Sequence, residues 1–245
     1  MISFFRSIAE NLPDWGPQLV RASGTTVLLT LLGFAAAFAL GLCLEFLRSR
    51  RSAIARQFVR GYLLLFRGVP ILVVLYLLYF GLPGVGVTLP AMAAGVLGLG
   101  LVYSAYLAEV FRAGLQSVPP GQREAALAAG LTPAQTFRLV MFPQAVRVVL
   151  PPLLISLISL LKDSSICALI AVPELTLTSR AIMAESFLPL QIFALTGLFY
   201  FAIAWPASLG VRALERRLQR GRSSNRPLAR PQPTAPGAVA LASDK

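Results

Sequence analysis

Five long apolar stretches constrain the fold of this chain more than any other feature of its sequence. A helix needs about 20 apolar residues to cross a bilayer, and stretches of this length recur through most of the 245 residues. Hydrophobic residues make up 56% of the chain and charged residues only 13%, against about 25% charged in typical soluble domains. We therefore predict an all-α integral membrane protein with five transmembrane helices. The predicted spans cover residues 24–47, 62–82, 89–111, 148–171 and 189–211.

Arginines between the predicted spans indicate the orientation of the chain. They gather in the loops after the first and third spans and in the C-terminal tail, whereas the loop at residues 82–90 carries no charge. Under the positive-inside rule, this distribution places the N-terminus outside and the C-terminus in the cytoplasm. The net charge of +12 comes from the same arginines. We do not interpret it as nucleic-acid binding, because these residues flank spans and contact anionic lipid.

The chain divides into three predicted parts. Residues 1–23 include Trp15 and a few charges, which is typical of an extracytoplasmic segment at the membrane interface. Residues 24–215 form the membrane domain, which includes a polar loop at 118–147. Residues 216–245 are basic and rich in Pro, Ser and Ala without periodicity, so we expect a disordered cytoplasmic tail.

The polar loop predicts two short helices joined by a tight corner. Residues 122–129 are good helix formers, and Gly130 follows at the place where a helix ends in the left-handed conformation. Thr132, Pro133 and Gln135 are typical of a new helix start, with the Thr as N-cap and the Pro at the first helical position. We expect Pro143 to stop the second helix or to bend it toward the membrane.

This loop resembles the EAA loop of ATP-binding-cassette (ABC) importer permeases. The family pattern is Glu-Ala-Ala, a Gly six positions after the Glu, and a later hydrophobic-x-hydrophobic-Pro. Flanking motifs are similar to the polar amino-acid branch of that family, the histidine, glutamine and arginine permeases, and the resemblance covers residues 20–215. The pattern is carried by Glu124, Ala125, Ala126, Gly130, Val140, Phe142 and Pro143, and the flanking motifs lie at 66–70, 79–83, 105–112, 115–118 and 162–165.

The resemblance implies a permease subunit that translocates a polar amino acid across the bacterial cytoplasmic (inner) membrane. It also implies as partners two ABC ATPase subunits, a second permease copy or paralogue, and an extracytoplasmic solute-binding protein. The chain has no phosphate-binding Gly-x-x-x-x-Gly-Lys-Ser/Thr motif, so we expect it to be a transport subunit and not an enzyme. We expect no bound cofactor, with ATP and Mg used by the partner ATPase. The residues implied to couple the spans to that ATPase are Gln122, Glu124, Ala125, Ala126 and Gly130.

Ionisable residues at membrane depth are the candidates for a substrate path. A charge there is costly unless it is paired or hydrated, so such groups usually face a polar path or the bundle interior. We expect a substrate path lined by Glu109, Asp163, Ser164 and Tyr106. For Lys162 we favour a structural ion pair with Glu109 or Asp163, and the same pairing remains the alternative for the two acids. We also assign structural roles to Arg67 and Pro70, the latter as a helix kink.

Other residues restrict the function further. The chain contains no His, and its two cysteines, Cys43 and Cys167, lie in predicted spans without a Cys-x-x-Cys spacing. We therefore expect packed thiols and no metal site. Glycines at positions 95, 98 and 100 are interpreted as a helix-packing stripe. Two alternative functions stay open: an ABC permease for another small solute, and an energy-independent channel or membrane scaffold.

Overall fold

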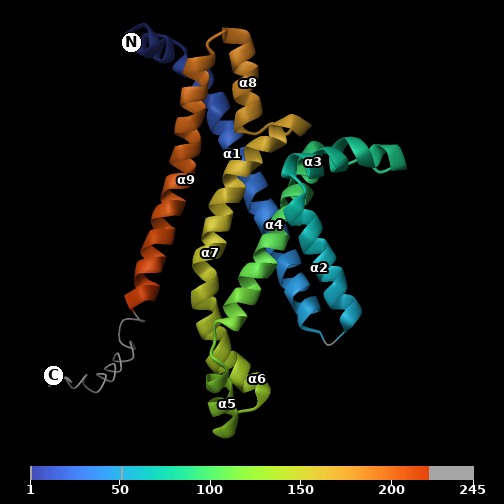
Figure 1. Cartoon of the computed structure of the whole chain (residues 1–245). Helices are drawn as coiled ribbons and strands as arrows, with labels where there is room; N and C mark the ends of the chain where they lie inside the picture. Colours follow the sequence, from blue (N-terminus) through green and yellow to red (C-terminus); the bar gives the residue numbers. More distant parts are fainter. Residues whose placement is uncertain (1, 51, 221–245) are drawn as a thin grey trace, which may run out of the picture.

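The computed structural model describes residues 2–50 and 52–220, and this part of the chain contains helices and no strands (Figure 1). Four helices in it are long and apolar enough to cross a membrane, and one bent pair of helices makes a fifth candidate span. The prediction of an all-α membrane protein with about five spans is confirmed. The elements are α1 (Ile2–Ser49), α2 (Ala53–Gly68), α3 (Ile71–Tyr76), the π-helix η1 (Leu77–Gly81), the 3-10 helix η2 (Leu82–Val85), α4 (Ala91–Gln116), α5 (Pro120–Ala128), α6 (Pro133–Gln135), the π-helix η3 (Thr136–Met141), α7 (Phe142–Asp163), the 3-10 helix η4 (Ser164–Ile170), α8 (Leu175–Ser186) and α9 (Pro189–Arg220).

Helix α1 is longer than the first predicted span, because the residues before position 24 continue the same helix. Pro13 and Pro17 lie within it, and Figure 1 shows its first turns at an angle to the rest. A proline inside a helix removes a backbone hydrogen bond and bends the axis. Trp15 is buried in a cluster with Ile182 of α8 and Ile192 of α9. The expected boundary after residue 23 therefore falls inside a helix that packs against the protein.

The second predicted span, residues 62–82, is not one straight helix. Helix α2 ends at Gly68 and α3 begins at Ile71, and the segments on either side of this break are bent by 104°. Pro70 lacks a backbone N–H and pushes the residue before it into an extended conformation, and Val69 has φ −91° and ψ 131°. The Val69 N–H still closes α2 by donating to the Leu65 carbonyl at 2.9 Å. The kink expected at Pro70 is a sharp corner between two helices.

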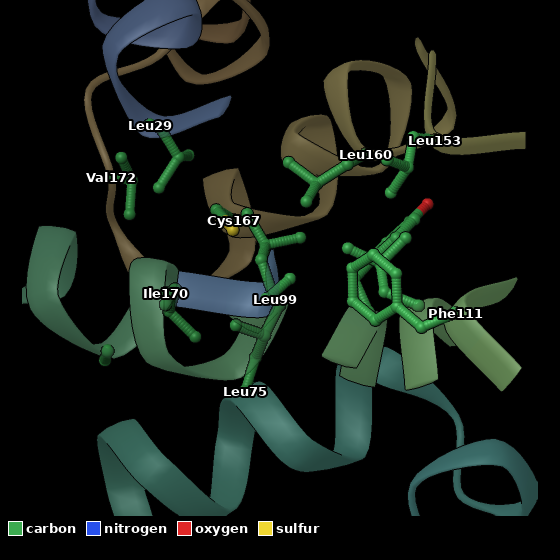
Figure 2. Packing of buried hydrophobic residues seen from close by; sticks show 13 residues of the cluster. Leu29, Leu75, Leu99, Phe111, Leu153, Leu160, Cys167, Ile170 and Val172 are labelled. Atoms are coloured by element: carbon green, nitrogen blue, oxygen red, sulfur yellow. The ribbon is translucent and has the colours of Figure 1, made fainter. Parts of the chain in front are cut away.

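Helix α4 lies at the centre of the hydrophobic core, between α1, α3 and α7. Figure 2 shows Leu99 of this helix among Leu29, Leu75 and Leu160 from its neighbours. Small residues allow the close approach: a Cβ on Gly98 would lie 2.5 Å from Leu75 Cδ2. A Cβ on Gly100 would lie 2.9 Å from the Cβ of Ala36. The interpretation of the glycines as a packing stripe is therefore confirmed.

The fourth predicted span is divided into two helices in the structure, and the fifth is longer than predicted. The fourth span consists of α7 and η4, so the α-helix changes to a 3-10 helix after Asp163. Helix α9 continues to Arg220, past the end expected at residue 211. The boundary expected at residue 216 thus lies inside α9, while the rest of the predicted tail, 221–245, lies outside the described residues.

Helix α8 was not expected; a buried carboxylate joins it to α9, and a backbone N–H joins it to α1. Glu174, which is fully buried, caps α8 by accepting from the Leu177 N–H at 2.9 Å. It also accepts from the Tyr200 hydroxyl of α9 at 2.6 Å. The Leu175 N–H donates to the Thr26 hydroxyl of α1 at 3.0 Å. Burial raises the pKa of the Glu174 carboxyl, against the opposing effect of these donors.

Candidate functional site

A hollow of about 440 Å³ lies between the α2–α3 corner, α4 and α7, and we call it the central hollow. Its volume falls within the range of small-molecule sites in proteins. Its lining includes apolar residues such as Val102 of α4 and Ile155 of α7. The polar residues that line it are Arg67 from α2, Tyr103 and Tyr106 from α4, and Ser156, Ser159 and Asp163 from α7.

The corner between α2 and α3 places Arg67 at the central hollow. Arg67 is in the last turn of α2, directly before the Gly68–Pro70 break. Its guanidinium carbon lies 5.7 Å from the centre of the Tyr106 ring, within the range of a cation–π contact. Arg67 forms no salt bridge with any residue of the described ranges. The hollow is therefore lined by a guanidinium that no carboxylate of the described residues pairs with in a salt bridge.

Asp163, the last residue of α7, also lines the central hollow. Its Oδ2 accepts a hydrogen bond from the Tyr103 hydroxyl at 2.7 Å, the one hydrogen bond to this carboxylate from the described residues. A carboxylate has about four lone-pair positions, so most of its capacity to accept is unused. The central hollow thus combines one cation and one anion, each with few protein partners.

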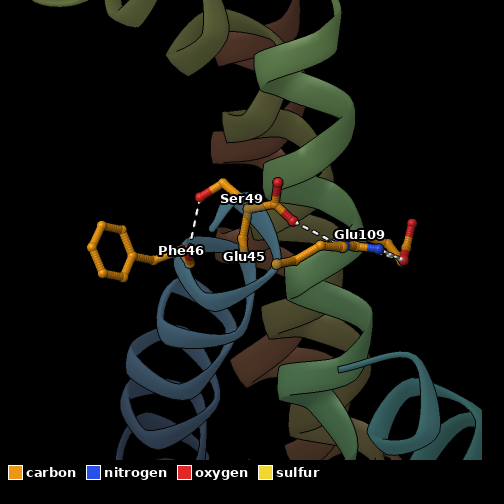
Figure 3. Close-up of polar contacts among 5 residues, drawn as sticks. Glu45, Phe46, Ser49 and Glu109 are labelled. Atoms are coloured by element: carbon orange, nitrogen blue, oxygen red, sulfur yellow. Dashed lines mark hydrogen bonds and ion pairs between the residues drawn. The ribbon is translucent and has the colours of Figure 1, made fainter. Parts of the chain in front are cut away.

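Glu109 does not line the central hollow. It binds Arg48 of α1, whose Nη1 lies 2.8 Å from Glu109 Oε1. Arg48 also binds Glu45, with 3.1 Å between Arg48 Nε and Glu45 Oε2, and Figure 3 shows a dashed contact at each of the two labelled carboxylates, Glu45 and Glu109. The group links α1 to α4 and borders a second, larger hollow.

Lys162 forms neither of the ion pairs we expected. No salt bridge in the described residues joins it to Glu109 or to Asp163, so that interpretation is wrong. The reason is the direction of the side chains on α7. Asp163 borders the central hollow, whereas Lys162 is exposed beside Tyr200 and Trp205 of α9.

The polar loop at 118–147 forms the predicted helical hairpin. Helix α5 ends before Gly130, which has φ 86°, and the Leu131 N–H donates to the Ala126 carbonyl at 3.1 Å. Thr132 and Gln135 form the expected capping box: the Thr132 N–H donates to Gln135 Oε1 at 2.9 Å, and the Gln135 N–H donates to Thr132 Oγ1 at 3.3 Å. The predicted left-handed glycine and the predicted caps are confirmed.

The second helix of this hairpin does not stop at Pro143. It runs from α6 through the π-helix η3 directly into α7, and Pro143 occupies the first turn of α7. Pro143 directly follows the π-helix η3, where the α-helical hydrogen-bond pattern is already interrupted, so its missing N–H does not end the helix. A hydrogen bond of 2.6 Å from Gln144 Nε2 to Gln122 Oε1 joins the first helix of the hairpin to α7. The hairpin is therefore attached to the helix that carries Asp163.

The exposed face of the hairpin mixes polar and apolar side chains. Glu124 and Ala125 are exposed, whereas Ala126 is buried between the two helices of the hairpin. Leu139 is 61% exposed and Phe142 51% exposed. Clustered apolar exposure of this kind marks surfaces that contact another molecule.

Comparisons with known proteins agree on one family. Residues 22–220 match the family described as binding-protein-dependent transport system inner membrane component. The chain is 37% identical over 201 residues to the probable amino-acid ABC transporter permease protein YckA of Bacillus subtilis, which covers 82% of this chain and 89% of that protein. It is 34% identical over 214 residues to the glutamine transport system permease protein GlnP of Escherichia coli, which covers 84% of this chain and 98% of that protein.

The chain belongs to this family of binding-protein-dependent transport system inner membrane components. A solved structure described as an amino acid ABC transporter with histidines matches with a TM-score of 0.80 and 32% identity, over 84% of this chain and 97% of that one. An inward-facing structure of the MetNI methionine ABC transporter matches with a TM-score of 0.60 and 23% identity, over 80% and 95% of the two chains, which supports the fold. The resemblance to ABC importer permeases is confirmed, and the chain is a multi-pass transport component and not an enzyme.

In this family member, four of the expected site residues come together and others lie elsewhere. Asp163, Tyr106, Arg67 and Pro70 all line the central hollow. Ser164 is fully buried and donates back to the Leu161 carbonyl at 2.7 Å, so its hydroxyl does not reach the hollow. Cys167 is buried as expected, but Cys43 is exposed and therefore not a packed thiol.

Two serines of the central hollow were missed in the sequence. Ser156 and Ser159 precede Asp163 by seven and four positions, and all three line the hollow from α7. Residues spaced in this way share one face of a helix. A polar stripe in an otherwise apolar span was thus a signal that the sequence offered.

Proposed function

We propose that this chain is the membrane-spanning permease subunit of an ATP-driven importer of a polar amino acid in the bacterial inner membrane. The observation that carries the proposal is the pairing of Arg67 and Asp163 around the central hollow. Families of this kind work with an ATPase and a solute-binding protein, and the relatives named above are amino-acid and glutamine permeases. That this chain carries an amino acid, as the names of these relatives say of them, is part of the proposal.

The central hollow suits the two charges that every free amino acid carries at neutral pH. The Arg67 guanidinium offers several N–H donors in a plane, which matches the two oxygens of an α-carboxylate. Asp163 has unused acceptor positions for an α-ammonium group. Tyr106 and Ser159 remain for the cargo side chain. We assign Glu109 and Ser164 to the support of the helices, since neither lines the hollow.

The hairpin is proposed to dock into the ATPase through Gln122, Glu124, Ala125, Ala126 and Gly130. Exposed Glu124 and Ala125 supply contact, and buried Ala126 keeps the two hairpin helices close. Because η3 leads without interruption into α7, displacement of the hairpin would act on the helix that ends at Asp163. Closure of two ATPase subunits on bound ATP and Mg would thus change the access of the hollow.

The orientation and assembly complete the proposal. The N-terminal segment 1–23 is placed outside and the hairpin in the cytoplasm, in agreement with the arginine distribution. A second permease copy or paralogue pairs with residues 24–215, and the solute-binding protein approaches the face opposite the hairpin. The tail 216–245 is proposed to stay on the cytoplasmic side.

Uptake into proteoliposomes tests this function. The vesicles contain the full chain, its co-expressed ATPase and solute-binding protein, and a panel of labelled amino acids. We expect uptake of one class of polar amino acid that requires ATP. ATP-dependent uptake of a sugar or an anion in place of amino acids would favour a different cargo, and ATP-independent flux would favour a channel.

A matched pair of substitutions at Gly130 tests the coupling. Gly130→Val places a β-branched residue at a φ of 86°, a conformation that such residues rarely adopt, and should abolish ATP-driven uptake. Gly130→Asn should retain most uptake, because Asn tolerates the left-handed conformation. Equal uptake by the two variants, both inserted at normal levels, would contradict the role of this corner in coupling.

A further inference from the structure

A second and larger hollow, of about 890 Å³, opens between the end of α1, the basic face of α2 and the last turns of α4, and we call it the basic hollow. It adjoins the central hollow, since Arg67 and Tyr106 border both. Its charged lining is unequal, with five arginines and two carboxylates. The arginines are Arg48, Arg56, Arg60, Arg67 and Arg112, and the carboxylates are Glu45 and Glu109.

Both carboxylates of the basic hollow form salt bridges with the same arginine, Arg48. Arg48 lies 3.1 Å from Glu45 and 2.8 Å from Glu109. Arg112 forms no salt bridge within the described ranges, and Arg60 donates only to the Gln57 side chain at 3.3 Å. Guanidinium groups remain charged at any physiological pH. The basic hollow therefore holds positive charge that the described part of the chain does not neutralise.

Helix α2, which lines this hollow, also carries exposed apolar side chains. Ile54 is 83% exposed, Phe58 60% and Leu64 71%, all on α2. Arg56, Arg60 and Arg67 share one face of α2. Going around the helix from this face, Leu64 comes next, and Ile54 and Phe58 follow on the neighbouring face. Side chains this apolar need lipid around them when they lie in a membrane protein. Helix α2 therefore borders acyl chains and charged groups at the same time.

The position of the basic hollow along the spans indicates how deep in the membrane it lies. It lies where α1 ends at Ser49 and α2 begins at Ala53, at the end of the helix bundle that also carries the hairpin α5–α6 (Figure 1). Span ends coincide with the headgroup layer of a bilayer. A phosphodiester in that layer can reach arginines that face the hollow while its acyl chains pass along the apolar strip.

We propose that the basic hollow binds the phosphodiester of an anionic phospholipid, with Arg60 and Arg112 as its principal donors. Arginine binds phosphate oxygens through paired N–H groups, and basic pockets between spans recognise anionic headgroups in this way. A lipid with net negative charge is favoured over a zwitterionic one, because the lining carries excess positive charge. Arg60 and Arg112 do not line the central hollow, so this proposal stands whether or not the central hollow binds an amino acid.

The test measures lipid binding to the full chain in nanodiscs of phosphatidylcholine that contain increasing fractions of phosphatidylglycerol. Retained phosphatidylglycerol is counted by native mass spectrometry. In the double variant Arg60→Gln/Arg112→Gln, we expect the half-saturating fraction of phosphatidylglycerol to rise on the order of tenfold, since each juxtamembrane arginine contributes to anionic-lipid binding. The matched control Arg147→Gln removes an exposed arginine of α7 that does not line the hollow, and should leave binding unchanged.

Three results would overturn the proposal. Binding by the double variant that equals wild type would remove Arg60 and Arg112 as donors. An equal loss in Arg147→Gln would show attraction by total charge without a site. Displacement of phosphatidylglycerol by millimolar inorganic phosphate would show that the hollow takes free phosphate and not a lipid. If the double variant does not insert, Arg60→Gln alone answers the question, because the Arg60 side chain is exposed and its replacement leaves the core intact.

Discussion

Asp163 and Glu174 are carboxylates eleven positions apart, and the structure surrounds them in opposite ways. Glu174 is fully buried and accepts hydrogen bonds from the Leu177 N–H and the Tyr200 hydroxyl. Asp163 borders the central hollow and accepts one hydrogen bond, from Tyr103. Neither forms a salt bridge within the described residues.

The difference separates an acid that holds helices together from an acid that we propose to bind the cargo. The donors around Glu174 come from α8 and α9, so its bonds fix the position of those helices, and little capacity remains for anything else. Asp163 accepts one hydrogen bond and borders the same hollow as the guanidinium of Arg67. An unsatisfied charge at membrane depth is costly, which is why we expect a cargo group to bind there.

Asp163→Asn should give the largest effect on transport. The substitution keeps an oxygen that can accept from Tyr103 and removes the negative charge that binds an ammonium group. A hydrogen bond to a charged group is worth about 1.5–3 kcal/mol, so we expect kcat/KM for amino-acid uptake to fall roughly tenfold to a hundredfold. Uptake in proteoliposomes measures this, and the thermal midpoint of the purified protein should stay close to that of wild type.

A matched change at Glu109 tests whether this effect belongs to the central hollow. Glu109→Gln removes a carboxylate at membrane depth that binds Arg48 and does not line the hollow. Its effect on uptake should be several times smaller. Comparable losses in both variants would show that any acid lost from the bundle impairs transport, and the assignment of Asp163 would fail.

Glu174→Ala should have its main effect on stability. The change leaves the Leu177 N–H without its acceptor and removes the cap of α8, and it leaves the Tyr200 hydroxyl with only its contact to the Thr176 hydroxyl. Buried groups left unpaired cost about 1–3 kcal/mol each, so we expect the free energy of unfolding to fall by about 2–4 kcal/mol. Thermal unfolding in nanodiscs measures the loss. Uptake per folded molecule should remain near wild type; a selective loss of uptake would place Glu174 on the transport path.

The hairpin shows how far the sequence alone can lead. Gly130, Thr132 and Gln135 were correctly predicted because caps and left-handed turns depend on residues within a few positions of one another. The corner at Pro70 was predicted only as an interruption. Its angle of 104° depends on how α3 packs against α4, where Gly98 receives Leu75.

The site was predicted in part, for a similar reason. Asp163 and Tyr106 were chosen because polar groups are rare at membrane depth, and this signal extends to Ser159. The partner of Glu109 could not be chosen in the same way. Arg48 lies 61 positions away, and only the register between α1 and α4 brings it to Glu109 in place of Lys162.

The smallest expected effects come from two tyrosines that make the same bond in the two regions. Tyr103 donates to Asp163 at 2.7 Å and Tyr200 donates to Glu174 at 2.6 Å. Each Phe substitution removes one hydroxyl, worth about 1 kcal/mol, or roughly fivefold in an equilibrium or a rate. Tyr103→Phe should lower uptake by that factor with little change in thermal midpoint, because solvent in the hollow can replace the lost donor. Tyr200→Phe should lower the thermal midpoint and leave uptake per folded molecule unchanged, because no solvent reaches the fully buried Glu174. If both variants changed the same quantity, the distinction between a ligand-facing acid and a structural acid would not hold in this protein.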